Sequence, residues 1–188
     1  KNLRYIDLSA DFRISNPNVY EENYKIKHKA KKLIKEAIYS IPELNRNSIK
    51  DYRIISNPGC YPTSIQIPLV PLIIKKLIKI DNITIDSKSG YSGAGKNLRK
   101  KFNHKNLFSS IYAYNIKNHR HVCEIDEHLL KFTKKKIHFS FYPYLLPTFR
   151  GILTTIYIKS NSGKSANYLR KFLINFYKNS KFIKILKL

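Results

Sequence analysis

The chain has 188 residues, of which 43% are hydrophobic, and 36 Lys and Arg stand against 12 Asp and Glu. This length predicts one domain, or one domain and part of another. No apolar run approaches the ~18 residues of a membrane-spanning helix, so we expect no membrane partner. Two cysteines at unrelated positions make no disulfide framework, which predicts a reducing, cytoplasmic setting. Because the chain begins with lysine and contains no methionine, we expect it to be processed or a fragment.

The formal net charge of +24 would by itself suggest a nucleic-acid partner. The excess, however, is mostly lysine spread along every predicted element, together with many Ile, Asn, Tyr and Phe residues. These residue types share AT-rich codons, so a drifting genome explains them without a binding surface. No aromatic and basic module of the RNP kind occurs in the sequence. We therefore expect no nucleic-acid partner, and a non-catalytic basic binding module stays an alternative.

The first third of the chain predicts short strands separated by polar segments. Residues 5–9 and 53–56 are predicted strands, and residues 10–13 form the loop after the first of them. Residues 16–35 are polar and rich in lysine, which indicates a solvated surface segment. Residues 39–44 are predicted to form a second ordered loop.

A long apolar segment that begins at Cys60 predicts a helix running to about Ile78. Pro68 and Pro71 lie inside this segment, so we expect a kink or an irregular first turn. Residues 82–87 then alternate apolar and polar side chains, which is typical of a half-buried strand.

The second half of the chain mixes helices and strands. Apolar spacing over residues 122–129 predicts a helix that begins near His121. Strands are predicted at 136–141 and 151–158, followed by an amphipathic helix at 168–176. Because strands and helices do not alternate strictly after the Cys60 helix, we expect an α+β sheet domain there.

Cys60 is the first candidate for chemistry. The Asn57–Gly59 stretch predicts a sharp turn after a buried strand, and Pro62 suits a first helical position, so Cys60 lies near a helix start. Free N–H groups and the helix dipole favour a thiolate there, and can lower a cysteine pKa from ~8.5 into the range ~3.5–7.5. The alternative is a small buried hydrophobic residue at a turn, and spacing alone leaves both interpretations open.

A cluster of glycines follows the predicted strand at 82–87. Three of the six glycines fall within Ser89-Gly90-Tyr91-Ser92-Gly93-Ala94-Gly95. Glycines allow backbone N–H groups to approach a ligand closely, as in an anion-binding nest. The spacing is not that of a dinucleotide-binding fingerprint. A flexible turn between two elements is the alternative interpretation.

His119 lies just before the helix predicted to begin near His121. A metal site made of His119, His121, Cys123 and His128 has no standard zinc spacing, so we expect no metal. A histidine close in space to a reactive cysteine is the better hypothesis, because acyl chemistry at a thiol needs a group that moves a proton.

Several blocks occur together and cover nearly the whole chain. They are Ile6–Arg13, Tyr39–Leu44, Ser56–Thr63, Ser89–Gly95, His119–His121 and Arg150–Leu153. In order and approximate spacing, these blocks resemble N-acetyl-gamma-glutamyl-phosphate reductase, the arginine-pathway relative of aspartate-semialdehyde dehydrogenase. The family's glycine-rich phosphate-binding turn and its C-terminal glycine- and asparagine-rich stretch have no counterpart here, so the resemblance implies a fragment that lacks both ends.

The resemblance implies a fold that combines α/β and α+β parts. Residues 1–59 would be the later part of a Rossmann-type NADP-binding domain. Residues 60–188 would be a mixed-sheet catalytic and dimerisation domain of the semialdehyde dehydrogenase/glyceraldehyde-phosphate dehydrogenase type, truncated at its C-terminal end. A homo-oligomer, either a dimer or a tetramer, is expected.

The resemblance also implies a mechanism. Cys60 would attack a small-molecule acyl phosphate and form a thioester, which hydride from NADPH would reduce to N-acetylglutamate semialdehyde. His119 would be the acid–base partner of Cys60. The residues expected to contact NADP are Ser9, Ser92, Gly93, Ala94 and Gly95. The residues expected to bind phosphate or carboxylate are Arg13, Arg120 and Arg150, because a guanidinium can bind either in a bidentate fork.

Aspartate-semialdehyde dehydrogenase remains an alternative, since it shares the cysteine mechanism. The Asp7–Arg13 and His119–His121 blocks argue against it.

Overall fold

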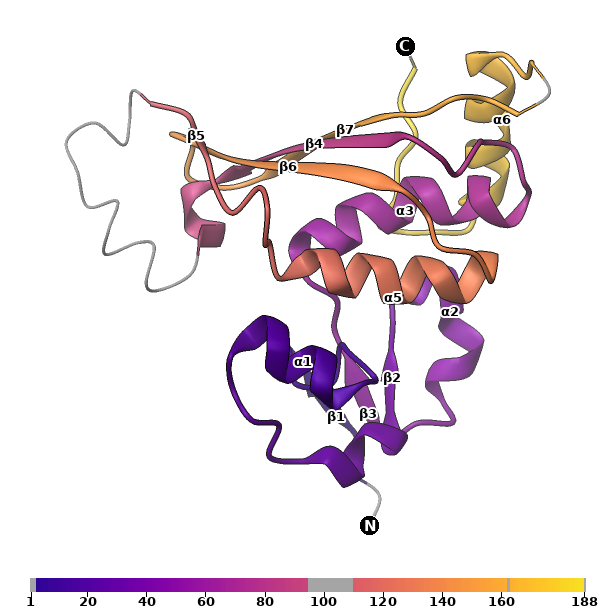
Figure 1. Cartoon of the computed structure of the whole chain (residues 1–188). Helices are drawn as coiled ribbons and strands as arrows, with labels where there is room; N and C mark the ends of the chain where they lie inside the picture. The colour runs from indigo at the N-terminus through magenta and orange to yellow at the C-terminus, as the bar shows by residue number, and fades with distance from the viewer. Residues whose placement is uncertain (1–2, 95–109, 162, 188) are drawn as a thin grey trace.

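The computed structural model of the chain describes residues 3–94, 110–161 and 163–187 (Figure 1). These residues form two separate β-sheets, and two helices lie between the sheets. Within the described ranges, each helix is too short or too polar to cross a membrane.

The N-terminal sheet contains three parallel strands, in the order β1 (Tyr5–Asp7), β3 (Ile54–Ser56) and β2 (Ala37–Tyr39). The strands predicted near residues 5 and 53 are therefore confirmed. The strands are connected by α1 (Pro17–Tyr24), the 3₁₀ helix η1 (Lys31–Glu36) and α2 (Pro42–Ile49).

One predicted loop is wrong, and the predicted surface segment contains helices that the sequence analysis did not assign. The polar segment 16–35 forms α1, whose N-cap Asn16 accepts a hydrogen bond from the Asn18 amide, with Pro17 in the first helical position. An Asn-Pro pair is a recognised helix start, so the signal was present in the sequence. Residues 39–44, expected as an ordered loop, instead contain the end of β2 and the start of α2.

The mixed sheet contains β5 (Tyr112–Ala113), β6 (Phe139–Leu146), β4 (Ile83–Gly90) and β7 (Ile152–Tyr157), in that order. The central strand β4 pairs with β6 in parallel and with β7 antiparallel. Buried and partly buried residues alternate along β4, as the sequence predicts. The strand predicted at 136–141 is shifted, because β6 starts at Phe139 and continues through Pro143, whose carbonyl accepts the Tyr114 amide.

The helix α3 (Cys60–Ile74) begins two residues before Pro62 and ends before the expected Ile78. Prolines are tolerated in a first turn because the N–H groups there have no acceptor within the helix. Lys76 ends the helix with a left-handed backbone at φ 52°, and the Leu77 amide donates to the Leu72 carbonyl at 2.9 Å. This is the hydrogen-bond pattern of a Schellman motif.

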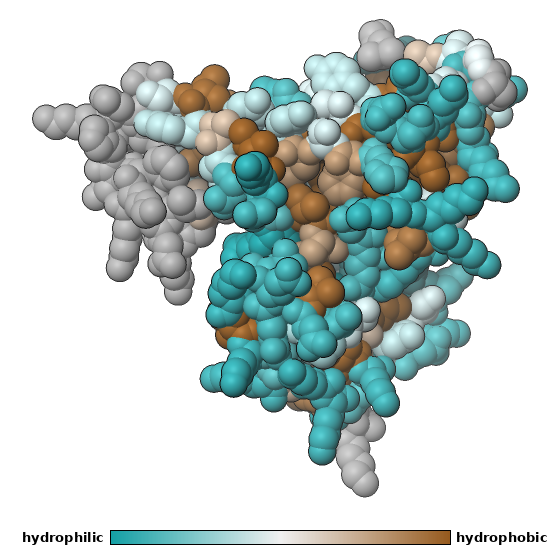
Figure 2. Space-filling model, viewed as in Figure 1, coloured by the Kyte–Doolittle hydropathy of each residue, from teal (hydrophilic) through white to brown (hydrophobic). Residues whose placement is uncertain are grey.

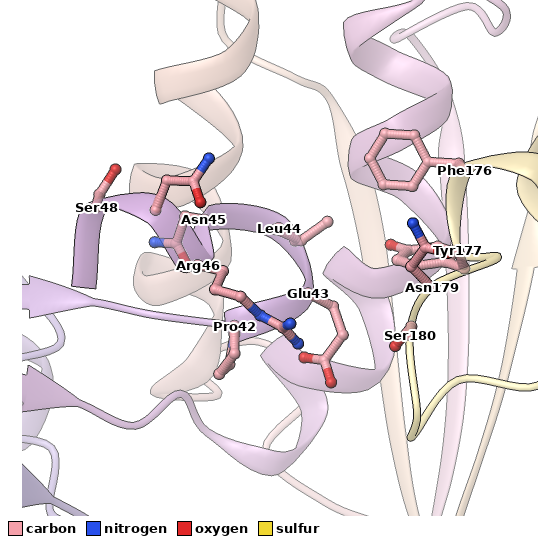
Figure 3. Close-up of a pocket in the computed structure, with 11 residues that line it drawn as sticks. Pro42, Glu43, Leu44, Asn45, Arg46, Ser48, Phe176, Tyr177, Asn179 and Ser180 are labelled. Atoms are coloured by element: carbon pink, nitrogen blue, oxygen red, sulfur yellow. The ribbon is translucent and has the colours of Figure 1, made fainter. Parts of the chain in front are cut away.

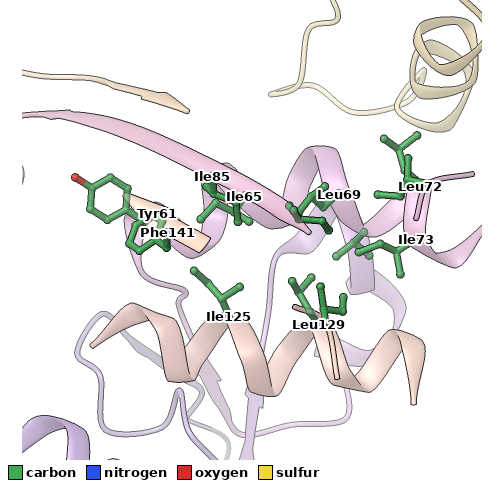
Figure 4. Close-up of a cluster of buried hydrophobic side chains, with 13 residues drawn as sticks. Tyr61, Ile65, Leu69, Leu72, Ile73, Ile85, Ile125, Leu129 and Phe141 are labelled. Atoms are coloured by element: carbon green, nitrogen blue, oxygen red, sulfur yellow. The ribbon is translucent and has the colours of Figure 1, made fainter. Parts of the chain in front are cut away.

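The hydrophobic core lies around α3, which packs on the mixed sheet together with α5 (His121–Thr133) and α6 (Ala166–Phe176) (Figure 1). Tyr61, Ile65 and Leu69 of α3 meet Ile85 of β4 and Ile125 of α5 in one buried cluster (Figure 4). Because α3 is covered by the sheet, by α5 and by α6, it is apolar around most of its circumference.

Hydrophilic residues dominate the face of the molecule shown in Figure 2. Hydrophobic residues on this face gather mainly toward the part that carries α3 and the mixed sheet.

Replacing a core side chain of α5 should destabilise the fold strongly. Ile125 is 0% exposed, so Ile125→Ala should lower the free energy of unfolding by about 2–5 kcal/mol, through lost burial and the cavity left behind. Leu130 on the same helix is 45% exposed, so Leu130→Ala should cost about 0.5 kcal/mol or less. Urea denaturation of both variants measures the difference, and equal costs would contradict this account of the core.

Candidate active site

Cys60 is the first residue of α3 and follows directly from β3 through a tight turn. The turn is anchored on the N-terminal sheet, because the Asn57 amide donates to the Asp7 carbonyl at 2.8 Å. Gly59 is the N-cap, and the Cys60 residue is exposed to solvent. The predicted strand, turn and helix around the cysteine are therefore confirmed.

The predicted lowering of the Cys60 pKa is wrong. Although Cys60 has exposed surface, the protein atoms around its thiol displace enough water for desolvation to raise the pKa above its ordinary value. The amides of Tyr61 and Cys60 and the Arg13 guanidinium act in the opposite direction, as expected at a helix N-terminus, but burial outweighs them. A thiol in this state needs a neighbouring group to accept its proton.

Gly59 allows α5 to approach the cysteine turn closely. A Cβ at Gly59 would lie 2.6 Å from His121 Nε2 and 3.0 Å from Glu124 Oε2. Its φ of −63° is ordinary, so the position requires glycine for lack of space and not for backbone conformation.

His119 lies in a buried ring of aromatic side chains just before α5. Tyr61, Tyr114 and Phe141 each meet its ring edge-on, at centroid distances of 5.4–5.6 Å. The His121 amide donates to His119 Nδ1 at 3.1 Å, so a neutral His119 carries its proton on Nε2. Desolvation and the nearby Arg120 charge lower the pKa of His119 to about 4, which keeps the ring neutral at pH 7.

His121 is the histidine that packs directly against Gly59, and the sequence did not indicate this. It is buried, and its Nδ1 has no hydrogen-bond partner among the described residues. Desolvation, followed by the His119, Arg13 and Arg120 groups, lowers its pKa to about 2. The structure therefore places both histidines of the motif beside the first turn of α3, one against Tyr61 and the other against Gly59.

The three candidate arginines differ in how free they are to bind an anion. Arg13 already donates from Nε to the Asn57 carbonyl at 2.8 Å and from Nη2 to the Leu8 carbonyl at 3.1 Å. Arg120 and Arg150 are exposed, and their guanidinium groups lie over the rings of Tyr24 and Phe149. The two exposed arginines can therefore reach a ligand without breaking a hydrogen bond described here.

The glycine-rich segment does not present free amides at Tyr91 and Ser92, which the anion-binding nest, one of the two interpretations left open, would need. It forms the 3₁₀ helix η2 (Tyr91–Ala94), in which the Tyr91 and Ser92 amides donate to the carbonyls of Thr148 and Phe149, each at 3.0 Å. Gly93 is exposed, and a Cβ there would lie 2.9 Å from Ser89 Oγ. Ser92, Gly93 and Ala94 lie together at the end of β4, and Gly95 lies outside the described residues.

Ser9 lies beyond the end of β1, in a turn of its own. Its amide donates to Asp7 Oδ1 at 3.0 Å, and its hydroxyl accepts the Asp11 amide at 3.1 Å. The residue is exposed, on a segment that leaves the N-terminal sheet.

The side chains considered for a metal site have other contacts. His128 Nε2 bonds to the Arg13 carbonyl at 2.7 Å, and Cys123 Sγ donates to the Arg120 carbonyl at 3.0 Å. Among the described residues, no group of three or more His, Cys, Asp or Glu side chains could hold a metal ion.

A hollow of about 420 Å³ lies between α2 and the segment after α6 (Figure 3). Its lining includes Glu43, Arg46, Tyr177 and Ser180, and none of the residues predicted for the active site.

Comparison with known proteins decides the family. A family model described as "Semialdehyde dehydrogenase, dimerisation domain" matches residues 60–188. The chain belongs to the semialdehyde dehydrogenase family. The chain is also similar in structure to aspartate semialdehyde dehydrogenase II from Vibrio cholerae, with a TM-score of 0.60 over 90% of this chain and 52% of the other. At 18% identity this likeness shows the fold alone, and it confirms the predicted mixed-sheet architecture.

Curated relatives match almost the whole chain. It is 45% identical over 186 residues to "Probable N-acetyl-gamma-glutamyl-phosphate reductase, chloroplastic" of Oryza sativa, covering 99% of this chain and 45% of the relative. It is 43% identical to the N-acetyl-gamma-glutamyl-phosphate reductase of Rhodospirillum rubrum, over 97% of this chain and 52% of the relative. The resemblance to this reductase is therefore confirmed, and the chain spans about half the length of the curated relatives it matches.

Iodoacetamide should label Cys60 faster than Cys123. Cys60 is exposed, whereas burial raises the pKa of the half-buried Cys123 to about 11 and its Sγ is hydrogen-bonded. Because the Cys60 pKa is raised, its labelling rate should keep increasing with pH beyond the ordinary thiol value of about 8.5. Mass spectrometry of the two peptides at a series of pH values gives both rates. A Cys60 rate that is already constant near neutral pH would contradict the raised pKa.

Proposed function

We propose that the protein reduces N-acetyl-gamma-glutamyl phosphate to N-acetylglutamate semialdehyde in arginine biosynthesis, with a nicotinamide cofactor, NADPH. The observation that carries this proposal is the position of Cys60, exposed at the start of α3, with His119 and His121 packed around the same turn. The names of the relatives supply the substrate, since a cysteine and a histidine alone are compatible with several acyl transfers.

In the proposed reaction, Cys60 Sγ bonds to the acyl carbon and the bond from that carbon to the phosphate oxygen breaks. A thioester forms on Cys60 and phosphate leaves, and the thiol proton ends on the departing phosphate. We assign His119 as the acid–base group through which this proton passes. Because His119 Nδ1 already accepts the His121 amide, Nε2 is the atom available for the transfer. Arg120 and Arg150 are assigned to the phosphate and carboxylate. Arg13 is a weaker candidate, because its Nε and Nη2 donate to backbone carbonyls and its Nη1 faces the Glu124 carboxylate.

The segment after β4 fits a nicotinamide cofactor in part. Gly93 is exposed beside Ser92 and Ala94, at the end of the strand β4. The Tyr91 and Ser92 amides, in contrast, are already occupied. We therefore propose that Ser92, Gly93 and Ala94 bind the cofactor through the solvent-exposed side of this segment. Gly95 and Ser9 are further candidates for cofactor binding. When bound, NADPH supplies the hydride that reduces the thioester.

We assign residues 1–59 to the later part of a Rossmann-type NADP-binding domain and residues 60–188 to the catalytic and dimerisation domain. The parallel N-terminal sheet and the match of the family model from residue 60 support this division. A cytoplasmic location is proposed from the cysteine content alone, while the relative from Oryza sativa is named as chloroplastic.

We propose a homo-oligomer, a dimer or tetramer, that pairs through the uncovered face of the mixed sheet. Helices α3 and α5 lie on one face of this sheet, and α6 packs against α3 (Figure 1). Leu153 and Tyr157 of β7 are 62% and 59% exposed, and Leu153 lies opposite Lys88 of β4 in the register. The Lys88 ammonium contacts Asp86 at 2.6 Å, so its charge is compensated within this surface. The description of the matched family model names a dimerisation domain.

The substrate is tested by phosphate-dependent, NADP-linked oxidation of the semialdehyde. The protein expressed from its natural gene should oxidise N-acetylglutamate semialdehyde and leave aspartate semialdehyde nearly untouched. Cys60→Ser should abolish this activity, because a hydroxyl there has no comparable acidity, while Cys123→Ser should retain it. Preference for aspartate semialdehyde, or activity that survives Cys60→Ser, would contradict the proposal.

The pairing surface is tested by a charge placed in the open sheet face. Leu153→Asp should shift the protein toward monomer in analytical ultracentrifugation, because a carboxylate would be buried in the interface. Leu130→Asp is the matched control, since Leu130 is exposed on α5, on the covered side of the sheet. An unchanged mass for Leu153→Asp, or an equal shift in both variants, would place the interface elsewhere.

A further inference from the structure

Glu124 is a buried carboxylate beside the nucleophile turn, and the proposed reaction gives it no role. It is 0% exposed and lies one turn after His121 on the same face of α5. Carboxylates are almost never fully buried without a partner that compensates their charge.

One oxygen of Glu124 joins the start of α3 to the N-terminal sheet. Oε1 accepts the Gly59 amide at 2.7 Å and the Tyr39 hydroxyl at 3.0 Å. The Tyr39 hydroxyl in turn accepts from Gln66 Nε2 of α3 at 2.6 Å. A single carboxylate therefore connects α5, β2 and two points of α3.

Arg13 holds the same turn from its other end. Its Nε donates to the Asn57 carbonyl at 2.8 Å, and its Nη1 lies 3.7 Å from Glu124 Oε2. The backbone of Arg13 is held by α5 as well, through His128 Nε2. The Arg13 guanidinium thus contacts Asn57, and the Glu124 carboxylate contacts Gly59. These two opposite charges also face each other.

Keeping the Glu124 carboxylate ionised in this buried position costs free energy. Its Oε2 has no hydrogen-bond partner among the described residues, and desolvation raises the pKa of the carboxyl above its ordinary value. The Gly59 amide, Arg13 and the Tyr39 hydroxyl act to lower that pKa without cancelling the effect of burial. Oε2 lies against Gly59, where a Cβ would come within 3.0 Å of it. A buried polar group kept under such conditions fixes the geometry around it more than it stabilises the fold.

We propose that Glu124 is a positioning residue for Cys60, whose carboxylate fixes the Gly59 peptide and thereby the first turn of α3 that carries the thiol. This inference rests on the proposed function for its kinetic consequence, although the positioning of the thiol can be measured without any substrate. Glu124 does not contact the reacting atoms, so its effect passes through the Gly59 backbone and through the electrostatic influence of its charge on the thiol.

Glu124→Gln tests the inference, because it keeps the shape of the side chain and removes its charge. For semialdehyde oxidation, kcat should fall about 10- to 100-fold with KM nearly unchanged, as expected for a misplaced nucleophile. Among the described residues, the groups with an electrostatic influence on Cys60 include Arg13, Glu124, Tyr61 and Tyr114, and the neutral His119 and His121 lie at the same turn. Because Glu124 is the carboxylate among them, its removal should move the pH profile of Cys60 alkylation to lower pH.

Glu127→Gln is the matched control. Glu127 lies on the same helix and also joins distant segments, since it accepts the Ser15 amide at 3.0 and 3.1 Å, but it does not contact the cysteine turn. This variant should keep kcat and the alkylation profile of the parent protein. A folded Glu124→Gln variant with unchanged kcat and an unchanged profile would overturn the inference. Equal losses of kcat in both variants, accompanied by matching losses of thermal stability, would also overturn the inference.

A milder variant covers the case in which Glu124→Gln does not fold. Tyr39→Phe removes one of the two hydrogen bonds to Oε1 and should lower kcat less than Glu124→Gln, again at unchanged KM. Unchanged kcat in Tyr39→Phe would count against the inference. If the parent protein oxidises neither semialdehyde, the proposed function fails, whereas the alkylation profiles of the parent and the Glu124→Gln variant still decide the positioning role.

Discussion

The structure depends on one hydrogen bond, which the backbone N–H of Gly59 donates to the buried Glu124 carboxylate at 2.7 Å. This hydrogen bond fixes where α3 begins, and α3 is the element on which the mixed sheet, α5 and α6 all pack. On the other side of the turn, Arg13 and the Asp7 carbonyl attach Asn57 to the N-terminal sheet. The turn before the cysteine is therefore held by contacts from α5 and from the N-terminal sheet.

The site follows from how α5 approaches this turn. Because Gly59 has no side chain, His121 and Glu124 lie against the backbone that precedes Cys60. The His121 amide then fixes the tautomer of His119, whose ring is enclosed by Tyr61, Tyr114 and Phe141. Burial keeps both histidines neutral and raises the thiol pKa, so the site stores a protonated thiol beside neutral rings. Chemistry at such a thiol needs a proton transfer in the same step as, or before, the attack on an acyl group.

Local patterns predicted the elements that carry the chemistry, and could not predict the contacts between them. The strand, turn and helix around Cys60 and the helix start at His121 follow from apolar runs, Pro and Gly, all of which act within a few residues. Glu124 meets Gly59 across 65 residues, so no local pattern indicates that contact. The Cys60 pKa was mispredicted for the same reason, because the dipole of α3 is local whereas desolvation depends on the whole fold. The amides of Tyr91 and Ser92 are occupied by carbonyls that lie 57 residues further along the chain.

The most direct test of the central claim, that Cys60 is the nucleophile held at the start of α3, is to trap its acyl intermediate. The protein would be mixed with N-acetyl-gamma-glutamyl phosphate without a nicotinamide cofactor, quenched in acid and digested for mass spectrometry. The account predicts an N-acetylglutamyl group on the peptide that contains Cys60, with release of one phosphate for each acyl group bound. An acyl group on the Cys123 peptide, or phosphate release with no acyl group on Cys60, would contradict it.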